Sequence, residues 1–184
     1  MDNGAGSYRR FLAGDNNGIA ELVREYRDGL IFYLFTFVND IHLAEDLAED
    51  TFVVLITKKP KFREKSSFKT WLYAIGRNEA LHYLKKDGRD TVSFDEAVNL
   101  QAEYKDVQAD YFKTEEKTVL HSAISSMKAE YRQVLWLFYF EELSTKEIAL
   151  IIKKSVHNTE TLLYRARKDV KQKLEQEGFT YENL

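Results

Sequence analysis

The stretch from Ser66 to Lys86 carries side chains that could bind nucleic acid. Apolar residues recur at positions 68, 71, 72, 75, 81 and 84, a helical spacing that predicts one buried stripe. The opposite face would offer cations for phosphates, amides for base edges and aromatic rings for stacking. Its members are Lys69, Thr70, Tyr73, Arg77, Asn78 and His82. Most charged helix faces are simply solvated, so both interpretations stay open on these residues alone.

The charges are unevenly distributed along the chain. Residues 58–90 hold 10 Lys and Arg against 4 Asp and Glu, and residues 128–174 hold 10 against 6, although the net charge is −3. Charges are screened over about 8 Å in physiological salt. Two basic segments separated by acidic ones can therefore each dock a polyanion.

An acidic run lies on the predicted helix 41–58. Leu43, Leu47, Val54 and Leu55 would face inward, while Glu45, Asp46, Glu49 and Asp50 would lie on the outer side. Four acids in six positions repel one another unless a basic partner meets them. The run is either a solvated face or a docking face for a basic protein surface.

Two helix caps in the C-terminal part predict a helix-turn-helix. Ser144 is followed three residues later by Glu147, which is the pattern of a capping box. Ser155 is a second cap and would open a helix from Val156 to about Glu175. Two helices joined by so short a turn are typical of duplex DNA readers.

The remaining elements complete an all-α prediction. Helical periodicity covers residues 16–39, 41–58 and 66–86, and returns from about residue 114 and over residues 129–141. Asn39-Asp40 separates the first two helices, and Pro60 lies in the basic loop that follows them. Between Asp90 and Tyr111 the pattern weakens, which indicates a linker. The chain has 184 residues, enough for two small domains with cores of their own.

Several classes of chemistry find no support in the sequence. Without cysteine there can be no disulfide or thiolate metal site, and a reducing cytoplasm fits this composition. No signal-peptide pattern and no run of about 20 apolar residues is present, so we expect no membrane insertion. His42 and Glu45 have a helical metal-pair spacing but lack a second ligand set. With no Gly-rich phosphate loop or nucleophile elbow either, we predict no catalytic residue, metal or cofactor, and no enzyme.

Three segments together resemble one known family. They are Ala44-Glu45-Asp46-Leu47-Ala48-Glu49-Asp50-Thr51-Phe52; Phe62-Arg63 with Ser66 to Ile75 and Arg77-Asn78; and Leu143-Ser144, Glu147-Ile148-Ala149, Ser155-Val156 and Tyr164-Arg165-Ala166-Arg167. In this order and spacing, they are similar to bacterial RNA polymerase sigma factors of the sigma-70 family, extracytoplasmic-function group. The resemblance implies a region 2 helical bundle over residues 1–90, a linker over 91–113 and a region 4 helix-turn-helix over 114–184.

The resemblance also implies partners and sites for a transcription initiation factor. Core RNA polymerase would be bound at its β′ clamp helices and β flap, with Asp46, Glu49 and Asp50 on the clamp side. The −10 element would be recognised and melted by Phe62, Arg63, Lys65, Ser66, Ser67, Lys69, Tyr73, Arg77 and Asn78. The −35 element would be read by Asn158, Glu160, Thr161, Tyr164, Arg165, Arg167 and Lys168. An anti-sigma factor is a further implied partner.

The sequence departs from the family pattern at three places. Glu64 stands where the −10 loop usually has a glycine, and Lys153-Lys154 replace a glycine and an apolar residue in the turn. Glu160 and Leu162 occupy recognition-helix positions that are often basic, although a glutamate can accept a hydrogen bond from cytosine N4.

Two other functions remain as alternatives. A stand-alone helix-turn-helix regulator would bind duplex DNA without polymerase, but would leave the acidic face 45–50 and the loop 62–67 unexplained. An all-helical enzyme or adaptor would need a catalytic metal or a buried carboxylate pocket.

Overall fold

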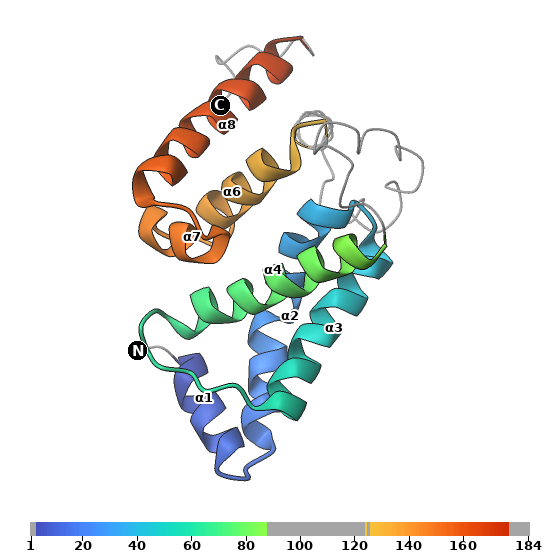
Figure 1. Ribbon diagram of the computed structural model, residues 1–184, viewed down its shortest axis with the longest axis vertical. Coiled ribbons are helices and arrows are strands. Elements are labelled where there is room, and N and C mark those ends of the chain that lie inside the picture. The colour runs from blue at the N-terminus through green and yellow to red at the C-terminus, as the bar shows by residue number, and fades with distance from the viewer. Residues whose placement is uncertain (1–2, 88–123, 125, 177–184) are drawn as a thin grey trace.

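The described part of the chain is entirely helical. A computed structural model describes residues 3–87, 124 and 126–176, and among these it contains no strand. The helices are α1 (Asn3–Leu12), α2 (Asn17–Val38), α3 (Ile41–Lys58), α4 (Phe68–Lys86), α6 (Ala129–Tyr139), α7 (Thr145–Ile152) and α8 (Val156–Gln176). Figure 1 shows α1 to α4 as one half of the molecule and α6 to α8 as the other. The predicted all-α class is confirmed, whereas the predicted linker 91–113 lies outside the described residues.

The first half is built around α2. This helix packs on α1, α3 and α4 and contributes fully buried leucines such as Leu30 and Leu34. From α3, Leu47 and Leu55 enter the core as predicted, but Leu43 and Val54 are only partly buried. Removing these apolar surfaces from water provides the main driving force for the fold.

Side-chain caps start two helices of the first half. Asp40 accepts a hydrogen bond from the backbone N–H of Leu43 at 3.1 Å, which starts α3 at the expected residue. Ser67 does the same for α4, accepting from the N–H of Thr70 at 3.2 Å. Both caps fix where the chain enters a helix, and so position the loop 59–67 between α3 and α4.

The sequence patterns did not predict α1. Its three-residue spacing of Ala5, Tyr8 and Phe11 buries one face against α2 and α4. The Tyr8 hydroxyl donates to the carbonyl of Pro60 at 2.8 Å, and burial raises the pKa of Tyr8 to about 12. The ring of Tyr8 also contacts those of Phe68 and Trp71. α1 therefore braces the loop 59–67 from behind.

The second half contains the predicted helix-turn-helix. Ser144 and Glu147 form the full capping box at the start of α7, and Ser155 accepts from the N–H of Asn158 at 3.1 Å in α8. Lys153 ends α7 with φ of 56°, the left-handed conformation that glycine adopts most easily. Phe140 lies within the predicted helical segment 129–141, but it follows the last residue of α6 and its side chain is exposed.

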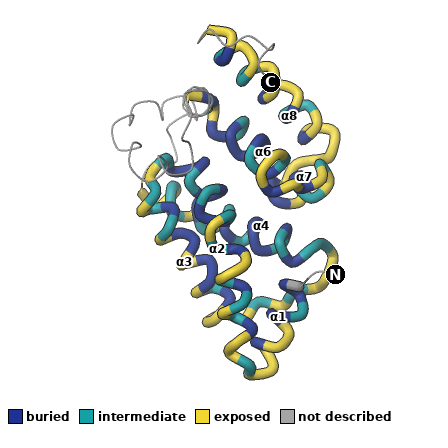
Figure 2. Tube along the Cα trace, turned by 180° about the vertical axis from the view of Figure 1, so that it is seen from behind, coloured by how far each residue is buried: buried dark blue, intermediate teal, exposed yellow. Residues whose placement is uncertain are grey.

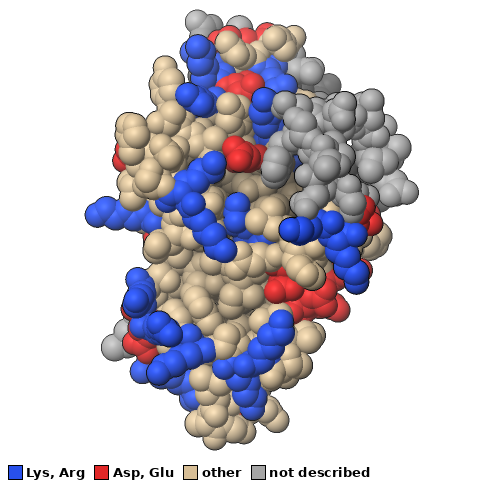
Figure 3. All heavy atoms as spheres, in the orientation of Figure 1, with Lys and Arg blue, Asp and Glu red and all other residues tan. Residues whose placement is uncertain are grey.

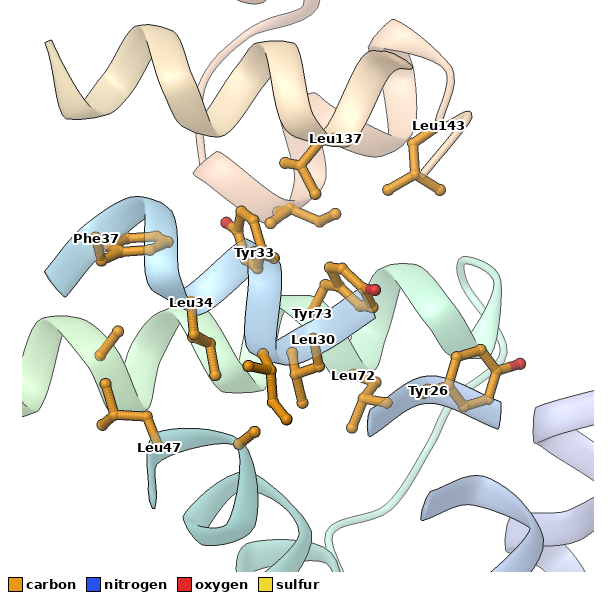
Figure 4. Close-up of a cluster of buried hydrophobic side chains, with 14 of the residues drawn as sticks. Tyr26, Leu30, Tyr33, Leu34, Phe37, Leu47, Leu72, Tyr73, Leu137 and Leu143 are labelled. Atoms are coloured by element: carbon orange, nitrogen blue, oxygen red, sulfur yellow. The ribbon is translucent and has the colours of Figure 1, made fainter. Parts of the chain in front are cut away.

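The two halves pack against each other, through α4 with α7 and α2 with α6. Figure 4 shows Leu137 and Leu143 of the second half pointing towards Tyr33 and Tyr73 of the first. The tube in Figure 2 is dark blue where these helices meet and mostly yellow along α8. The expectation of an open outer face on α4 is wrong for Thr70 and Tyr73, because the second half covers both.

Candidate nucleic-acid interfaces

The acidic face of α3 is solvent-exposed. Asp46, Glu49 and Asp50 are exposed and have no ion pair within the described residues. Glu45 is different, because it is half-buried and lies 3.7 Å from Arg27 and 3.6 Å from His42. Figure 3 shows acidic side chains gathered on the lower half, where α3 lies. The three exposed acids are therefore available to pair with a basic partner.

Two apolar residues extend this acidic face. Val53 and Ile56 are large, exposed hydrophobic residues, and follow Asp46, Glu49 and Asp50 at helical spacing on α3. The sequence analysis did not single them out. A helix face with acids at one end and apolar side chains at the other is suited to a protein partner rather than to DNA.

The loop 59–67 closes one side of an open cleft of about 980 Å³. From this loop Phe62, Glu64, Ser66 and Ser67 line the cleft, and Phe62 packs on Trp71 at 5.0 Å between ring centroids. Arg63 and Lys65 are exposed beside it. The cleft thus combines an aromatic ring, hydroxyls and neighbouring cations, which are the groups needed to hold an unstacked base and its phosphates.

The other side of the cleft comes from α1 and α2 and carries charges of both signs, because Glu21 and Glu25 lie there beside the arginines. Arg9 and Arg10 of α1 and Arg24 of α2 line it, and none of them was among the predicted site residues. Arg9 lies 3.8 Å from Glu64, which has φ of 52°. Glu21 accepts from Ser7 at 2.7 Å and pairs with Arg10, and these contacts, the Ser7 hydrogen bond first, lower its pKa. The only sequence signal for this wall was the pair Arg9-Arg10 in a segment not predicted to be helical.

The polar residues of α4 mostly contact the second half. Lys69 Nζ lies 2.7 Å from Glu141 Oε2 and donates to the Glu141 carbonyl at 3.1 Å. Asn78 Oδ1 accepts from Lys153 Nζ at 2.9 Å. Arg77 Nε is buried and has no hydrogen-bond partner in the described part of the chain. Predicted strand-contacting residues are thus brought together along α4, but they face protein in this conformation.

Glu141 is a buried carboxylate that collects donors from both halves. Besides Lys69, it accepts from Trp136 Nε1 at 3.2 Å and from the hydroxyl of Tyr73. Burial first, and then the charge and hydrogen bond of Glu141, raise the pKa of Tyr73 well above its usual range. Gly29 of α2 lies against this group, since a Cβ there would come within 2.5 Å of the Tyr73 hydroxyl and 2.8 Å of Glu141 Oε1.

Glu147 connects the helix-turn-helix to the start of α4. Its Oε2 accepts from the N–H of Ser144 at 3.0 Å, while its Oε1 accepts from Ser67 Oγ at 3.2 Å and Thr70 Oγ1 at 3.3 Å. Burial alone would raise the pKa of Glu147, but the hydrogen bonds from Ser144, Ser67 and Thr70 lower it on balance. One carboxylate therefore caps α7 and also ties α7 to α4.

The recognition helix α8 presents its predicted residues outward. Exposed side chains there are Asn158, Glu160, Tyr164, Arg165, Arg167 and Lys168, whereas Thr161 is half-buried. Arg167 is held in place, because its Nε donates to the Tyr139 hydroxyl at 3.0 Å and its guanidinium lies 4.7 Å from the Phe138 ring centroid. The other exposed side chains of this row could contact base edges if α8 lay in the major groove of duplex DNA.

Comparison with known families decides between the alternatives. Residues 22–90 match the model of sigma-70 region 2, and residues 117–170 match that of sigma-70 region 4. The RNA polymerase sigma factor YlaC of Bacillus subtilis is 31% identical over 161 residues, covering 86% of this chain and 92% of YlaC. The ECF RNA polymerase sigma factor SigM of the same organism is 30% identical over 153 residues, covering 83% and 93%.

The chain belongs to the sigma-70 family, in its extracytoplasmic-function group.

Two solved structures show the same fold. The sigma factor RpoE of Bartonella quintana, in complex with the anti-sigma factor NepR, superposes with a TM-score of 0.64 at 23% identity, over 85% of this chain and 96% of that one. CnrH, in complex with the cytosolic domain of CnrY, gives 0.65 at 20% identity over 95% and 96%. The predicted resemblance is confirmed, and transcription initiation as a sigma factor is favoured over a stand-alone regulator.

The described residues contain neither a membrane-spanning helix nor a cluster of metal ligands. None of the helices there is long and apolar enough to span a membrane. No group of three or more His, Asp or Glu side chains in the same part of the sigma factor could hold a metal ion.

Proposed function

We propose that this sigma factor binds core RNA polymerase through α3, captures the unwound −10 strand with the cleft and α4, and reads the −35 element with α8. The surfaces would belong to a region 2 domain over residues 1–90 and a region 4 domain over 114–184, joined by residues 91–113. The factor would act in the cytoplasm, where polymerase and chromosomal DNA are found, and would catalyse no reaction itself.

The observation that carries the polymerase contact is the unpaired acidic face of α3. Asp46, Glu49 and Asp50 point into solvent and repel one another, which costs stability unless a basic partner binds. The exposed Val53 and Ile56 beside them would add apolar contact area. The β′ clamp helices are the partner that the family implies for this face, and the β flap is the one it implies for region 4.

The −10 contact is supported by the chemistry of the cleft. A base flipped out of the stack needs an aromatic wall and polar edges, which Phe62, Ser66 and Ser67 supply. Arg63, Lys65, Lys69, Arg77 and Asn78 would hold the strand along the loop and α4, and Tyr73 would join them once its covering is removed. Arg9, Arg10 and Arg24 would add cations for phosphates, although Glu21, Glu25 and Glu64 line the same cleft.

The −35 contact is supported by the free face of α8. Asn158, Glu160, Thr161 and Tyr164 lie towards its N-terminal end, where a recognition helix meets base edges. Arg165, Arg167 and Lys168 follow and would contact phosphates. Glu160 would favour a cytosine whose N4 amino group faces it.

An anti-sigma factor is a further proposed partner. The two solved structures described above are complexes, of RpoE with the anti-sigma factor NepR and of CnrH with the cytosolic domain of CnrY. Co-purification of a small binding protein with the tagged sigma factor from its native host would identify it.

Run-off transcription with bacterial core enzyme tests the function. The wild-type chain should direct promoter-dependent transcripts from genomic fragments, and Asp46→Arg with Asp50→Arg should abolish both transcription and co-purification with core polymerase. Asp28→Arg with Glu142→Arg reverses two exposed acids elsewhere and should change neither. Unchanged co-purification of the α3 variant would exclude the docking role, and no transcript from the wild type would exclude the function.

A further inference from the structure

Donors of the proposed −10 surface are occupied by carboxylates from the other half. Lys69 Nζ lies 2.7 Å from Glu141 Oε2. Ser67 Oγ and Thr70 Oγ1 donate to Glu147 Oε1 at 3.2 and 3.3 Å. Asn78, further along α4, accepts from Lys153 of the turn before α8. Ser67, Lys69 and Thr70, at the start of α4, thus each donate to a carboxylate of the second half.

The matched groups have the chemistry of a nucleic-acid backbone contact. Lysine ammonium groups and Ser or Thr hydroxyls are common ligands of phosphate oxygens. A carboxylate oxygen is an anionic acceptor of the same kind, and forms charge-assisted hydrogen bonds of the same length. Glu141 and Glu147 therefore satisfy the donors that a phosphodiester strand would otherwise satisfy.

We infer that Glu141 and Glu147 act as an internal substitute for strand phosphates, so that the region 4 half masks the −10 surface until the halves separate. The inference rests on the −10 assignment under Proposed function. A DNA strand and the second half would compete for Lys69, Ser67 and Thr70. The apparent affinity for the strand would therefore fall as the closed fraction of the molecules rises.

The rest of the contact between the halves suits a reversible closure. Phe32 meets Trp136 at 5.6 Å between ring centroids, and Leu137 and Leu143 lie over Tyr33 and Tyr73 (Figure 4). Arg132 donates to the carbonyl of Thr36 at 3.0 Å. Polar and apolar contacts are mixed, as in interfaces between domains that move relative to each other.

The two DNA-contacting surfaces are affected differently by the closure. The −35 residues of α8, such as Tyr164 and Arg165, stay exposed, whereas Tyr73 of α4 is buried and Lys69 is only partly exposed. The closed molecule is therefore masked at the start of α4, while Arg63 and Lys65 of the loop 59–67 and the outer face of α8 stay open. Opening, rather than recognition of the −35 element, becomes the step that lets a strand extend from the loop onto α4.

A distance measurement tests the closure directly. The chain has no cysteine, so Leu12→Cys and Gln172→Cys place spin labels only on α1 and α8, at exposed positions in opposite halves. In this background, Glu141→Gln with Glu147→Gln removes both carboxylate charges. A carboxamide at 141 also has one acceptor oxygen for three donors. The matched control is Glu142→Gln with Glu175→Gln, which removes two charges at exposed positions.

The probe is a short fluorescein-labelled single-stranded oligodeoxynucleotide of mixed sequence. The Glu141/Glu147 variant should show longer label-to-label distances and about tenfold tighter binding of the probe, and the control should show neither. Opening without tighter binding would overturn the inference, and so would distances and affinity equal to those of the control.

The unsubstituted sequence in the same labelled background gives a readout that does not depend on the variant folding. Saturating the probe must lengthen the label-to-label distance, because competing ligands act reciprocally. No lengthening overturns the inference, even where run-off transcription by the same protein upholds the proposed function. Absence of transcript, in contrast, is a failure of the proposed function itself.

Discussion

The two helices assigned to DNA, α4 and α8, carry their polar residues in opposite ways. On α4, Tyr73 is 1% exposed and hydrogen-bonded to Glu141, whereas on α8 Tyr164 is 68% exposed. Lys69 is paired with a buried carboxylate, while Lys168 projects into solvent. Side chains on α8 can therefore vary with the promoter sequence at little cost to stability. On α4, the same groups contribute to the fold and, in the proposed function, to strand binding as well.

Truncating the tyrosine on each helix should give the largest contrast. Tyr73→Ala removes a buried ring stacked on Tyr33 and leaves Glu141 without one of its donors. We expect a loss of about 3–5 kcal/mol in the free energy of unfolding. Tyr164→Ala should change it by less than about 0.5 kcal/mol. Urea denaturation followed by circular dichroism measures both, and equal losses would contradict the comparison.

Removing the lysine on each helix should give a smaller contrast. Lys69→Ala leaves the Glu141 carboxylate buried without its cation, and we expect a loss of about 2 kcal/mol, reduced from a fully buried pair because Lys69 is partly exposed. Lys168→Ala should be close to neutral in stability. Urea denaturation measures both changes. An unchanged free energy of unfolding in Lys69→Ala would show that the ion pair contributes nothing.

The tie between α7 and α4 should depend on pH. The pKa of Glu147 is lower in the folded protein than in the unfolded chain. Its contribution is therefore fully present above the unfolded value of about 4.3 and is lost as the pH falls through the folded pKa. Denaturation between about pH 6 and pH 3 should show a shallower loss of stability for Glu147→Gln than for the wild type. Glu142→Gln, at an exposed neighbouring position, should keep the wild-type slope.

The smallest effect is expected at the turn that precedes α8. Lys153 adopts φ of 56°, so Lys153→Gly relieves backbone strain and should raise stability by about 0.5 kcal/mol. Lys154 has no positive φ and lies 3.7 Å from Glu130, so Lys154→Gly adds chain entropy to the unfolded state, removes this ion pair and should lower stability. Thermal unfolding of the two variants should shift in opposite directions. A fall for both would show that the Lys153 contact with Asn78 outweighs the strain.

Local signals predicted much of the fold. Apolar periodicity together with Asp40, Ser144 and Ser155 placed α3, α7 and α8 within a residue or two, because caps and stripes act over one or two helical turns. The helix α1 was not predicted, because Gly4 and Gly6 lower its helix propensity. The structure gives one of them a reason, since a Cβ at Gly4 would come within 2.5 Å of the Phe68 ring.

Such local patterns could not predict contacts between segments that lie far apart in the sequence. The residues Lys69 and Asn78 look like a solvated face until Glu141 and Lys153, more than 70 positions later, are placed against them. The wall of the cleft formed by α1 and α2 was not predicted for the same reason, because Arg9 and Arg24 meet the loop 59–67 only in the folded chain. The exposed row on α8 was predictable, since it needs no partner within the molecule.

The residue at position 29 lies where a change of side chain would affect how firmly the two halves close. A glycine inside a helix costs about 1 kcal/mol relative to alanine, yet α2 keeps one where Tyr73 and Glu141 approach. An added methyl group would meet the ends of those two side chains and not the backbone. Natural variation at this position could therefore set how readily the sigma factor opens, while the DNA-contacting side chains themselves stay unchanged.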